Sequence, residues 1–532
     1  MFNKFKNTNL KNLHLNEAYF FYFVLLINIL LLFFTKFYPS MDGPAHLYNS
    51  NLIDHLLFGN KPLSEFYTIN TIVIPNWVSH FLLSLFHLFL PGWLAEKMLL
   101  VLYILGISIT FRLLIKELNP QNLSLSILIF PFAYSFLFHL GFYNYSVSFI
   151  VFFGTLYFWL KNRESSRITT YLVLFSLLTA IYFCNVLLYA FLGLTICFYN
   201  IYFSFENYCL HKSIKLFIKE CYKKLFVWFI ISLPSLILLV IFYKTVAFFP
   251  ADQKYGIKEL IRWLNDVRAL IVYDYNGEQL LTAQFLHVLI AISLLGIFLR
   301  FKEKVNKKFE IIKSDIMLIP ILIALTLFFI TPSGSGAGMM SDRYCYMIFI
   351  FALIWVITQP IPKSVGQLAV LFVLVVHFGL QMKHMNGSIR NLDKNAITIH
   401  QAANYIEKNS IVLPVNLSDN WLELHFSNYL GVDKPMIILE NYEAAVGWFP
   451  IKWNANSLPN VLLSDKASVS GIRWPCNSKA KIIRKIQYVM LFGNMGKLDD
   501  AQWKELKDLL GSDFKLKYCS ENKYVMIYEK TR

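Results

Sequence analysis

Long apolar runs recur through the first two thirds of the chain and limit the folds that it can adopt. Several of them approach the ~20 residues that an α-helix needs to cross about 30 Å of hydrocarbon. Only 15% of the 532 residues are charged, well below the share of about 25% in soluble domains. We therefore predict an all-α polytopic membrane domain with about eleven transmembrane helices.

Basic residues in the loops between these runs alternate along the chain. The predicted spans cover residues 18–37, 93–114, 123–138, 145–160, 170–183, 186–203, 225–243, 281–299, 316–330, 344–357 and 365–382. The apolar stretch 78–90 has only about 13 residues, so we predict an interfacial helix there. Lys and Arg concentrate in the loops around 161–167, 212–224 and 300–313. The positive-inside rule places these loops and the N-terminus in the cytoplasm.

The formal net charge of +16 and the cysteine pattern exclude two other classes of function. The basic residues lie mostly in short loops, where they orient the chain and contact anionic lipid, so we expect a lipid bilayer and no nucleic acid as partner. The seven cysteines form no CxxC pair, which argues against a structural zinc site of cysteines.

The last third of the chain has a different character, because no run in it is long enough to span a membrane. Helical spacing at 396–408 and 500–510 alternates with short buried strands at 411–415, 436–439 and 488–492, and a hairpin is predicted from 514–519 and 524–528. We predict a transmembrane domain at 1–384, with a first outer loop at 38–92, and an extracytoplasmic α/β domain at 385–532. Cys476 and Cys519 lie in this second domain, and the sequence alone does not determine whether they pair.

The loop after the first span carries the clearest candidate for chemistry. Residues 37–49 read FYPSMDGPAHLYN and place Asp42 beside the predicted bilayer edge. A carboxylate there can act as a general base toward a hydroxyl, although Asp42 is also a good helix N-cap with Pro44 in the first turn. His46 follows one helical turn later, where it could bind a phosphate, orient Asp42 or share a metal with it. Asn49 is a further candidate for the cavity wall.

Two more outer loops contain candidate binding residues. Asn144, in the sequence GFYNY, suits a wall that faces a sugar, whereas its aromatic neighbours fit an interfacial belt. The segment 331–344 reads TPSGSGAGMMSDRY; its small residues allow close backbone approach, and Arg343 can bind a phosphate through two parallel hydrogen bonds. A snorkelling Arg343, or one paired with Asp342, is the alternative. Tyr344 lies beside Arg343 at the mouth of the span.

An acid beyond the first span, a long first outer loop, many spans and a C-terminal extracytoplasmic domain occur together in this chain. The combination resembles the GT-C superfamily of polyprenyl-phosphate-dependent glycosyltransferases, which includes protein O-mannosyltransferases and bacterial aminoarabinose transferases. The resemblance covers nearly the whole chain and implies that Arg343 serves the lipid phosphate. GT-C members often have a second acid in the first or second outer loop. Here the second outer loop has none, which leaves Asp54 and Glu65 as nearby alternatives.

The resemblance implies an inverting glycosyltransferase with its active site on the outer face. We expect a multi-pass protein of a bacterial inner membrane that moves a sugar from a polyprenyl-phosphate carrier to a glycan, lipid or protein acceptor. Asp42 is the predicted base; His46, Asn49, Asn144, Arg343 and Tyr344 are the predicted substrate-binding residues. No cofactor is required by the sequence, and a divalent metal is the candidate. Asp274 and Glu278 are reserve acids, and Trp421, His425, Tyr442 and Glu443 are candidates for holding an acceptor glycan.

Two alternatives remain open at this point. One is a non-catalytic lipid-glycan transporter or export accessory, although the sequence shows no clear internal repeat of the kind that transporters have. The other is an oligosaccharide polymerase or ligase with a diphosphate-linked donor. The polar mass of this chain lies at its C-terminus and not in a late outer loop, which favours the transferase.

Overall fold

The computed structural model describes residues 2–246, 254–304, 313–335, 338–454, 457, 462–463, 472–473, 486–500 and 503–531. These residues form two compact units. Unit 1 contains Met1–Leu31, Val101–Phe138 and Tyr145–His384, and unit 2 contains Leu32–Leu100, His139–Asn144 and Met385–Arg532. Cys476 lies outside the described residues.

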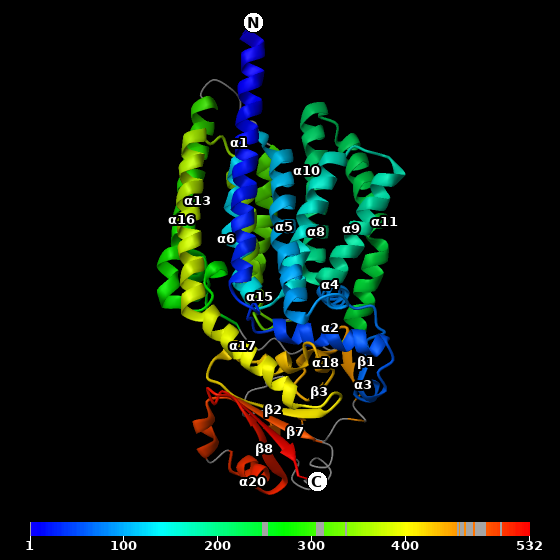
Figure 1. Cartoon of the computed structure of the whole chain (residues 1–532). Coiled ribbons are helices and arrows are strands. Elements are labelled where there is room, and N and C mark those ends of the chain that lie inside the picture. The colour runs from blue at the N-terminus through cyan, green and yellow to red at the C-terminus, as the bar shows by residue number, and fades with distance from the viewer. Residues whose placement is uncertain are drawn as a thin grey trace. The chain divides into compact units, whose positions relative to one another are not determined.

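Unit 1 is built from long apolar helices. They are α1 (Phe2–Leu31), α5 (Gly92–Leu118), α8 (Tyr143–Asn162), α9 (Ile168–Cys184), α10 (Val186–His211), α11 (Ile214–Thr245), α13 (Tyr275–Lys304), α14 (Leu318–Ile330), α15 (Met340–Ile357) and α16 (Lys363–His384), of which α5 and α8 begin in unit 2. Seven described helices are long and apolar enough to cross a membrane. Helices α9, α10 and α11 pack side by side (Figure 1). Every predicted span except one corresponds to a helix.

The exception is the run 123–138, where the prediction of one continuous helix is wrong. The structure has a 3₁₀ helix at Pro120–Ile129, followed by the short helices α6 (Phe130–Ala133) and α7 (Phe136–His139). Pro131 cannot donate a backbone hydrogen bond, and Asn122 has non-helical φ and ψ. Ile127 and Phe130 are buried, which fits the rule that irregular backbone at membrane depth must be covered by protein.

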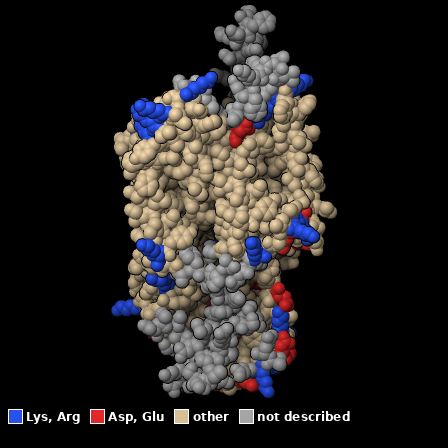
Figure 2. All heavy atoms as spheres, turned by 180° about the vertical axis from the view of Figure 1, so that it is seen from behind, with Lys and Arg blue, Asp and Glu red and all other residues tan. Residues whose placement is uncertain are grey.

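The outward faces of the unit 1 helices are apolar. Phe226, Phe229 and Ile230 on α11 and Leu371 and Val375 on α16 are all exposed. Figure 2 shows a wide band of unit 1 surface without visible charged side chains, with Lys and Arg beyond it. Such a band on a helical unit is the surface expected to face lipid.

The core of unit 2 is a five-stranded sheet in the order β3-β2-β7-β9-β8. The strands are β2 (Ile411–Leu417), β3 (Ile437–Ile438), β7 (Tyr488–Gly493), β8 (Phe514–Cys519) and β9 (Val525–Lys530). β2 runs parallel to β3 and β7, while β9 is antiparallel to β7 and β8. All residues of β2 except one are buried, as expected for a central parallel strand. Helices α17 (Arg390–Ala402) and α20 (Lys504–Asp513) complete the predicted α/β region (Figure 1).

Residues from the first predicted outer loop are part of the same unit. They form α2 (Gly43–Leu57), α3 (Lys61–Phe66), β1 (Tyr67–Ile69) and α4 (Val78–His87), and β1 pairs with β4 (Ile451–Trp453). The Tyr48 hydroxyl donates to the Met436 carbonyl at 2.8 Å and accepts from the Ile438 amide at 3.0 Å. A Cβ at Gly431 would lie 2.2 Å from the Tyr48 ring, so this position requires glycine.

Asp433 joins three segments of unit 2. Its carboxylate accepts hydrogen bonds from the Gly92 amide at 2.7 Å, from His400 Nε2 at 2.7 Å and from His87 Nε2 at 3.3 Å. Burial alone would raise the pKa of Asp433, but the hydrogen bonds from His400, His87 and Gly92 hold it well below the ordinary value.

We predict that Asp433→Asn lowers stability at neutral pH by about 1 kcal/mol, a value reduced for the partial exposure of the side chain. Because the folded state depresses the pKa of Asp433, its stabilising effect is present above the unfolded value of about 3.9 and is lost as the pH falls through the folded value. The difference in Tm between wild type and variant should therefore shrink below about pH 4. Thermal unfolding in detergent measures it, with the exposed Asp419→Asn as control. An equal difference at every pH would contradict the assignment.

Candidate functional site

Asp42 lies at the start of α2, but its side chain does not cap the helix. The Asp42 amide donates to the Leu140 carbonyl at 2.9 Å, and Ser40 Oγ accepts from the Gly43 amide at 3.1 Å. The Asp42 carboxylate makes no capping hydrogen bond and is almost fully buried. The helix start is thus stabilised by Ser40, and the Asp42 carboxylate is available for other contacts.

A glycine in the second predicted outer loop allows the backbone there to lie close to Asp42 and Gly43. Gly141 has φ +88°, and a Cβ on it would lie 2.6 Å from the Gly43 amide nitrogen. Glycine is the residue that adopts this conformation without steric cost. The backbone of residues 139–144 therefore packs directly against the turn that carries Asp42.

The Asp42 carboxylate faces a histidine that is held by a second carboxylate. His425 Nε2 lies 3.8 Å from Asp42 Oδ1, and His425 Nδ1 donates to Glu440 Oε1 at 2.8 Å. Glu440 Oε2 also accepts from Ser427 Oγ at 2.7 Å and from Asn428 Nδ2 at 2.5 Å. A histidine whose Nδ1–H is fixed in this way presents Nε2 in one defined orientation. Glu440, His425 and Asp42 thus form a buried polar chain.

Burial and neighbouring charges shift the pKa of Asp42 and the pKa of His425. Burial raises the pKa of Asp42, although the charges of His425 and His46 offset part of the effect. Burial alone would lower the pKa of His425, but the charge and hydrogen bond of Glu440 and the charge of Asp42 raise it above its ordinary value. The Tyr442 ring stacks on His425 with the ring centroids 4.2 Å apart. A carboxylate with a raised pKa binds a proton more readily than an ordinary aspartate does.

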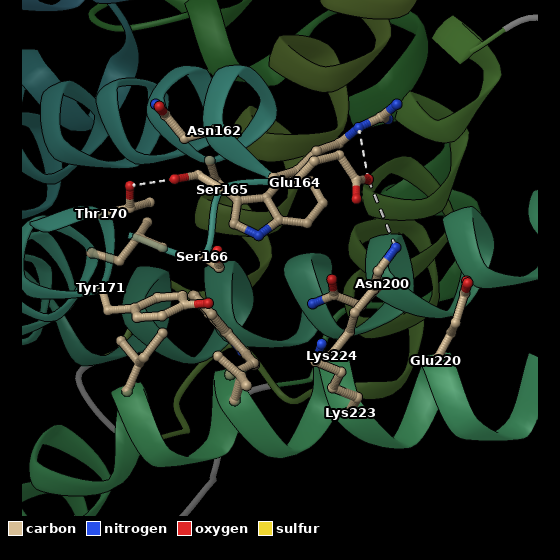
Figure 3. Close-up of a pocket in the computed structure, with 16 residues that line it drawn as sticks. Asn162, Glu164, Ser165, Ser166, Thr170, Tyr171, Asn200, Glu220, Lys223 and Lys224 are labelled. Carbon is tan, nitrogen blue, oxygen red and sulfur yellow. Dashed lines mark hydrogen bonds and ion pairs between the residues drawn. The ribbon is translucent and has the colours of Figure 1, made fainter. Parts of the chain in front are cut away.

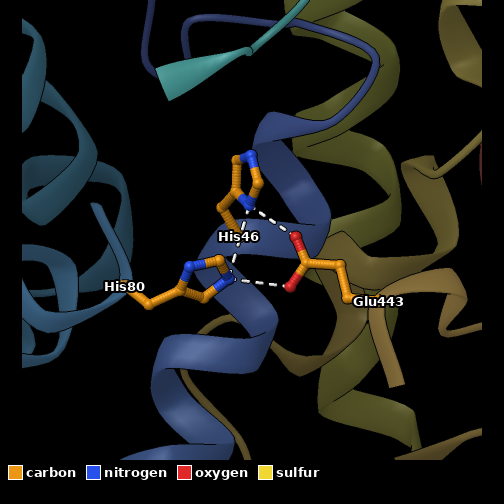
Figure 4. A group of neighbouring side chains, drawn as sticks. All are labelled: His46, His80 and Glu443. Atoms are coloured by element: carbon orange, nitrogen blue, oxygen red, sulfur yellow. Dashed lines mark hydrogen bonds and ion pairs between the residues drawn. The ribbon is translucent and has the colours of Figure 1, made fainter. Parts of the chain in front are cut away.

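A second cluster, His46, His80 and Glu443, lies one helical turn along α2 (Figure 4). His46 Nδ1 is 2.5 Å from Glu443 Oε1, and His80 Nε2 is 2.7 Å from Glu443 Oε2. The two ring nitrogens are 3.4 Å apart. All three side chains are buried, and they come from α2, α4 and α18 (Tyr442–Val446).

Mutual interactions set the charges of this cluster. Burial alone would raise the pKa of Glu443, but the charges of His80 and His46 and their hydrogen bonds hold it well below the ordinary value. Burial alone would lower the pKa of His46, yet the charge and hydrogen bond of Glu443 raise it. Asn49 Nδ2 donates to Glu443 Oε2 at 2.6 Å and to the Asn441 side chain at 3.2 Å. The predicted residue Asn49 is therefore placed in this cluster.

The donor set suits a divalent metal ion. Two imidazoles and one carboxylate are a ligand set of catalytic zinc sites, which keep an open fourth position. Ligands about 2.0–2.1 Å from a tetrahedral ion lie roughly 3.3–3.4 Å from one another, and the two histidine nitrogens have this separation. The Glu443 oxygens lie closer to these nitrogens, at 2.5 and 2.7 Å, and would move outward to share an ion with them. His46, His80 and Glu443 are thus the described residues that would hold the metal.

The Asn144 side chain forms hydrogen bonds at the start of α4. Its Oδ1 accepts from the Ser79 amide at 2.9 Å, and its Nδ2 donates to the Asn76 carbonyl at 3.0 Å. Both ends of the amide are thereby engaged at the start of α4, the helix that carries His80. This contact positions α4 and uses the groups that were predicted to face a sugar.

Arg343 and Tyr344 belong to α15 of unit 1, and both are buried. Arg343 Nε donates to the Gly338 carbonyl at 3.1 Å, and its guanidinium lies 5.0 Å from the centre of the Tyr145 ring. Asp342 forms an ion pair with Arg268 at 3.4 Å.

Asp54 and Glu65, the alternatives for a second acid, and the reserve acid Glu278 have other surroundings. Asp54 accepts a hydrogen bond from Ser84 Oγ, and Glu65 is exposed. Glu278 accepts from the amides of Val272 and Asp274 at 2.7 and 3.0 Å and pairs with His384 at 3.2 Å. The contacts of Asp54 and Glu278 stabilise local structure.

Sequence reasoning missed His80 and Glu440, and it named Glu443 only as a candidate for contact with an acceptor glycan. Two signals pointed to them. His80 is an ionisable residue inside an apolar run, and Glu440 to Glu443 read ENYE directly after a buried strand. The carboxyl ends of parallel strands are common places for ligand sites.

The comparisons with known proteins support the fold. No protein-family model matches the sequence, and the search of curated proteins finds no match. The structure is similar to the crystal structure of apo ArnT, an aminoarabinose transferase from Cupriavidus metallidurans, with a TM-score of 0.53 and 10% identity over 96% of this chain and 98% of that chain. The undecaprenyl phosphate complex of the same protein has a TM-score of 0.52 and 10% identity over 95% and 97% of the two chains.

An identity of 10% makes this likeness a statement about fold. The likeness confirms the predicted resemblance to the GT-C superfamily at that level. Together with the seven apolar helices, it identifies the chain as an integral membrane protein with a GT-C-like fold.

Proposed function

We propose that this protein transfers a sugar from a polyprenyl-phosphate carrier to a hydroxyl of a glycan, lipid or protein acceptor on the outer face of the membrane, with inversion. The observation that carries the proposal is the buried Asp42 carboxylate, which caps no helix and faces His425. Such a carboxylate, held beside two histidines and two further acids, is typical of a catalytic site. The GT-C-like fold supports a lipid-phosphate donor, because a solved structure of similar fold contains undecaprenyl phosphate.

The reaction requires one proton acceptor and one leaving group. The acceptor oxygen attacks the anomeric carbon from the face opposite the carrier, and its proton moves to the Asp42 carboxylate. The new C–O bond forms as the bond between the anomeric carbon and the phosphate oxygen breaks. The polyprenyl phosphate leaves as an anion and keeps the bonding electrons. The raised pKa of Asp42 favours this proton transfer.

His425 and Glu440 act on Asp42 as positioning residues in this scheme. His425 Nε2 faces the carboxylate, and the Glu440 contact keeps the imidazole in place. The positive charge that His425 carries when protonated stabilises ionised Asp42, so the base is in its active form over a wider pH range.

The cluster of His46, His80 and Glu443 supports the same site. A divalent ion bound there would supply a Lewis acid for phosphate oxygens. The three side chains would hold it, and Asn49 would orient Glu443 through its hydrogen bond. In the proposal Arg343, beside Tyr344, binds the carrier phosphate, since a guanidinium matches phosphate geometry.

We expect Asp42→Asn to reduce sugar transfer by about 10²–10⁴-fold, because the amide cannot accept the proton. The measurement is transfer from a panel of radiolabelled polyprenyl-phosphate sugars by purified protein in lipid. Asp54→Asn, another acid of α2, is the matched control and should retain activity. Full activity of Asp42→Asn would remove Asp42 from the mechanism. Carrier binding without transfer by wild type would favour a transporter.

Glu440→Gln should move the acidic limb of the pH–rate profile to higher pH. Without Glu440 the pKa of His425 falls, its positive charge is lost, and the pKa of Asp42 rises further. The measure is kcat/KM against pH, with the exposed Glu407→Gln as control. A limb that stays in place while the rate falls would indicate a purely structural role for Glu440.

Purified wild-type protein should contain about one zinc or similar divalent ion per chain, and Glu443→Gln and His80→Ala should lose it. Elemental analysis by mass spectrometry counts the metal without an activity assay. His55→Ala is the control, because His55 lies on α2 as His46 does but is outside the cluster. Saturating metal at about 100-fold above its Kd should add roughly 2.7 kcal/mol of stability to wild type. Equal metal content in all variants would exclude this cluster as the site.

A further inference from the structure

A polar pocket lies among the helices of unit 1, between α8, α9, α10 and α11 (Figure 3). It encloses about 270 Å³. Arg163 and Ser165 come from the connection between α8 and α9, Asn200 comes from α10, and Lys224 comes from α11. The buried rings of Trp159 and Trp228 form apolar walls. We call this cavity the α8–α11 pocket.

Two cations of the α8–α11 pocket are only loosely paired. Arg163 Nε lies 3.6 Å and Lys224 Nζ lies 3.8 Å from Glu164 Oε1, both beyond ordinary hydrogen-bond length. The Glu164 side chain is 70% exposed, whereas those of Arg163 and Lys224 are 26% and 23% exposed. An exposed pair of this kind contributes little energy. The donors of the guanidinium and the ammonium therefore remain available to an anion in the pocket.

Asn200 provides an independent observation. Only 7% of it is exposed, and its side chain lines the pocket among the residues drawn in Figure 3. Within the described part of the chain, the Asn200 amide makes no side-chain hydrogen bond. The Asn200 amide lines the pocket, and a ligand group that accepts its hydrogen bonds would be stabilised there.

This pocket is remote from the residues proposed to bind the carrier phosphate. Tyr145, at the other end of α8, donates its hydroxyl to the Arg343 carbonyl. The 17 steps along α8 from Tyr145 to Asn162, at 1.5 Å each, separate the two places by roughly 26 Å. The separation is close to the thickness of the hydrocarbon layer. The α8–α11 pocket is therefore a different site, near the other end of α8 from Tyr145.

The surroundings of the pocket indicate an amphiphilic ligand. The exposed apolar residues Leu172 on α9 and Phe226, Phe229 and Ile230 on α11 belong to the helices that form it. Acyl chains can pack on such a surface while a head group enters the polar cavity. Basic pockets between membrane helices bind the phosphate of anionic lipids in this way.

We propose that the α8–α11 pocket binds the phosphate group of an anionic membrane lipid of the leaflet at the Lys- and Arg-rich end of unit 1. Arg163 and Lys224 contact the phosphate oxygens, Asn200 donates its amide hydrogens to the same group, and Trp159 and Trp228 flank the glycerol region. This site is independent of the proposed sugar transfer.

The test is native mass spectrometry of delipidated full-length protein, titrated with phosphatidylglycerol or with phosphatidylcholine. Wild type should retain one phosphatidylglycerol more tightly than phosphatidylcholine. Lys224→Gln and Asn200→Ala should each weaken phosphatidylglycerol binding by about tenfold. Lys302→Gln, an exposed lysine on α13 outside the pocket, should leave binding unchanged. Thermal unfolding of each variant verifies its folding, and the partly exposed Lys224 provides a variant that does not disturb the core.

Inorganic phosphate is titrated in a parallel experiment in phosphatidylcholine nanodiscs. Lipid-dependent binding that the pocket variants weaken, with no effect of inorganic phosphate, supports the proposal. Saturable stabilisation by inorganic phosphate alone would assign the pocket to a soluble anion and overturn the lipid as its source. Equal retention of both lipids, or equal binding by wild type and both pocket variants, would overturn the site.

Discussion

The carboxylate of Glu443 lies between His46 and His80, and the organisation of unit 2 depends on this buried contact. Removing one partner of a buried ion pair lowers the stability of a protein by about 3–5 kcal/mol, because the remaining charge is left without compensation. Glu443 therefore ties α2 and α4 to the strand connection that carries α18. The same contact keeps Asp42, one turn before His46, at a defined distance from His425.

This arrangement combines charge with restricted backbone. Gly141 and Gly431 occupy positions where a side chain would collide with Gly43 and with Tyr48. The chain at Gly141 can therefore lie close to the turn before α2, and the chain at Gly431 can lie close to the Tyr48 ring. The buried polar groups then lie close together. Burial raises the pKa of Asp42, and the neighbouring carboxylates raise the pKa of His425.

Unit 1 follows a different constraint, because its exposed surface is apolar and its backbone must satisfy its own hydrogen bonds. In the long helices the backbone hydrogen bonds are made within each helix, so these helices can be exposed to lipid. The broken segment 120–139 meets it by burial, with Pro131 and Asn122 interrupting what run length alone predicted to be one helix. Arg163, just beyond the end of α8, lines the α8–α11 pocket together with Asn200 of α10 and Lys224 of α11.

The sequence by itself determined the membrane class, nearly all the helices, the strands of the α/β region and the candidacy of Asp42 and His46. Run length, alternation and turn residues are local properties, so they can be read without knowledge of the fold. Only the tertiary structure decided which polar groups meet. His80 and Glu443 are 363 positions apart, and no periodicity relates them. Tertiary contacts likewise occupied Asn144 with the start of α4, where the sequence indicated a sugar-facing wall, because packing in three dimensions determines which side of a polar group remains accessible.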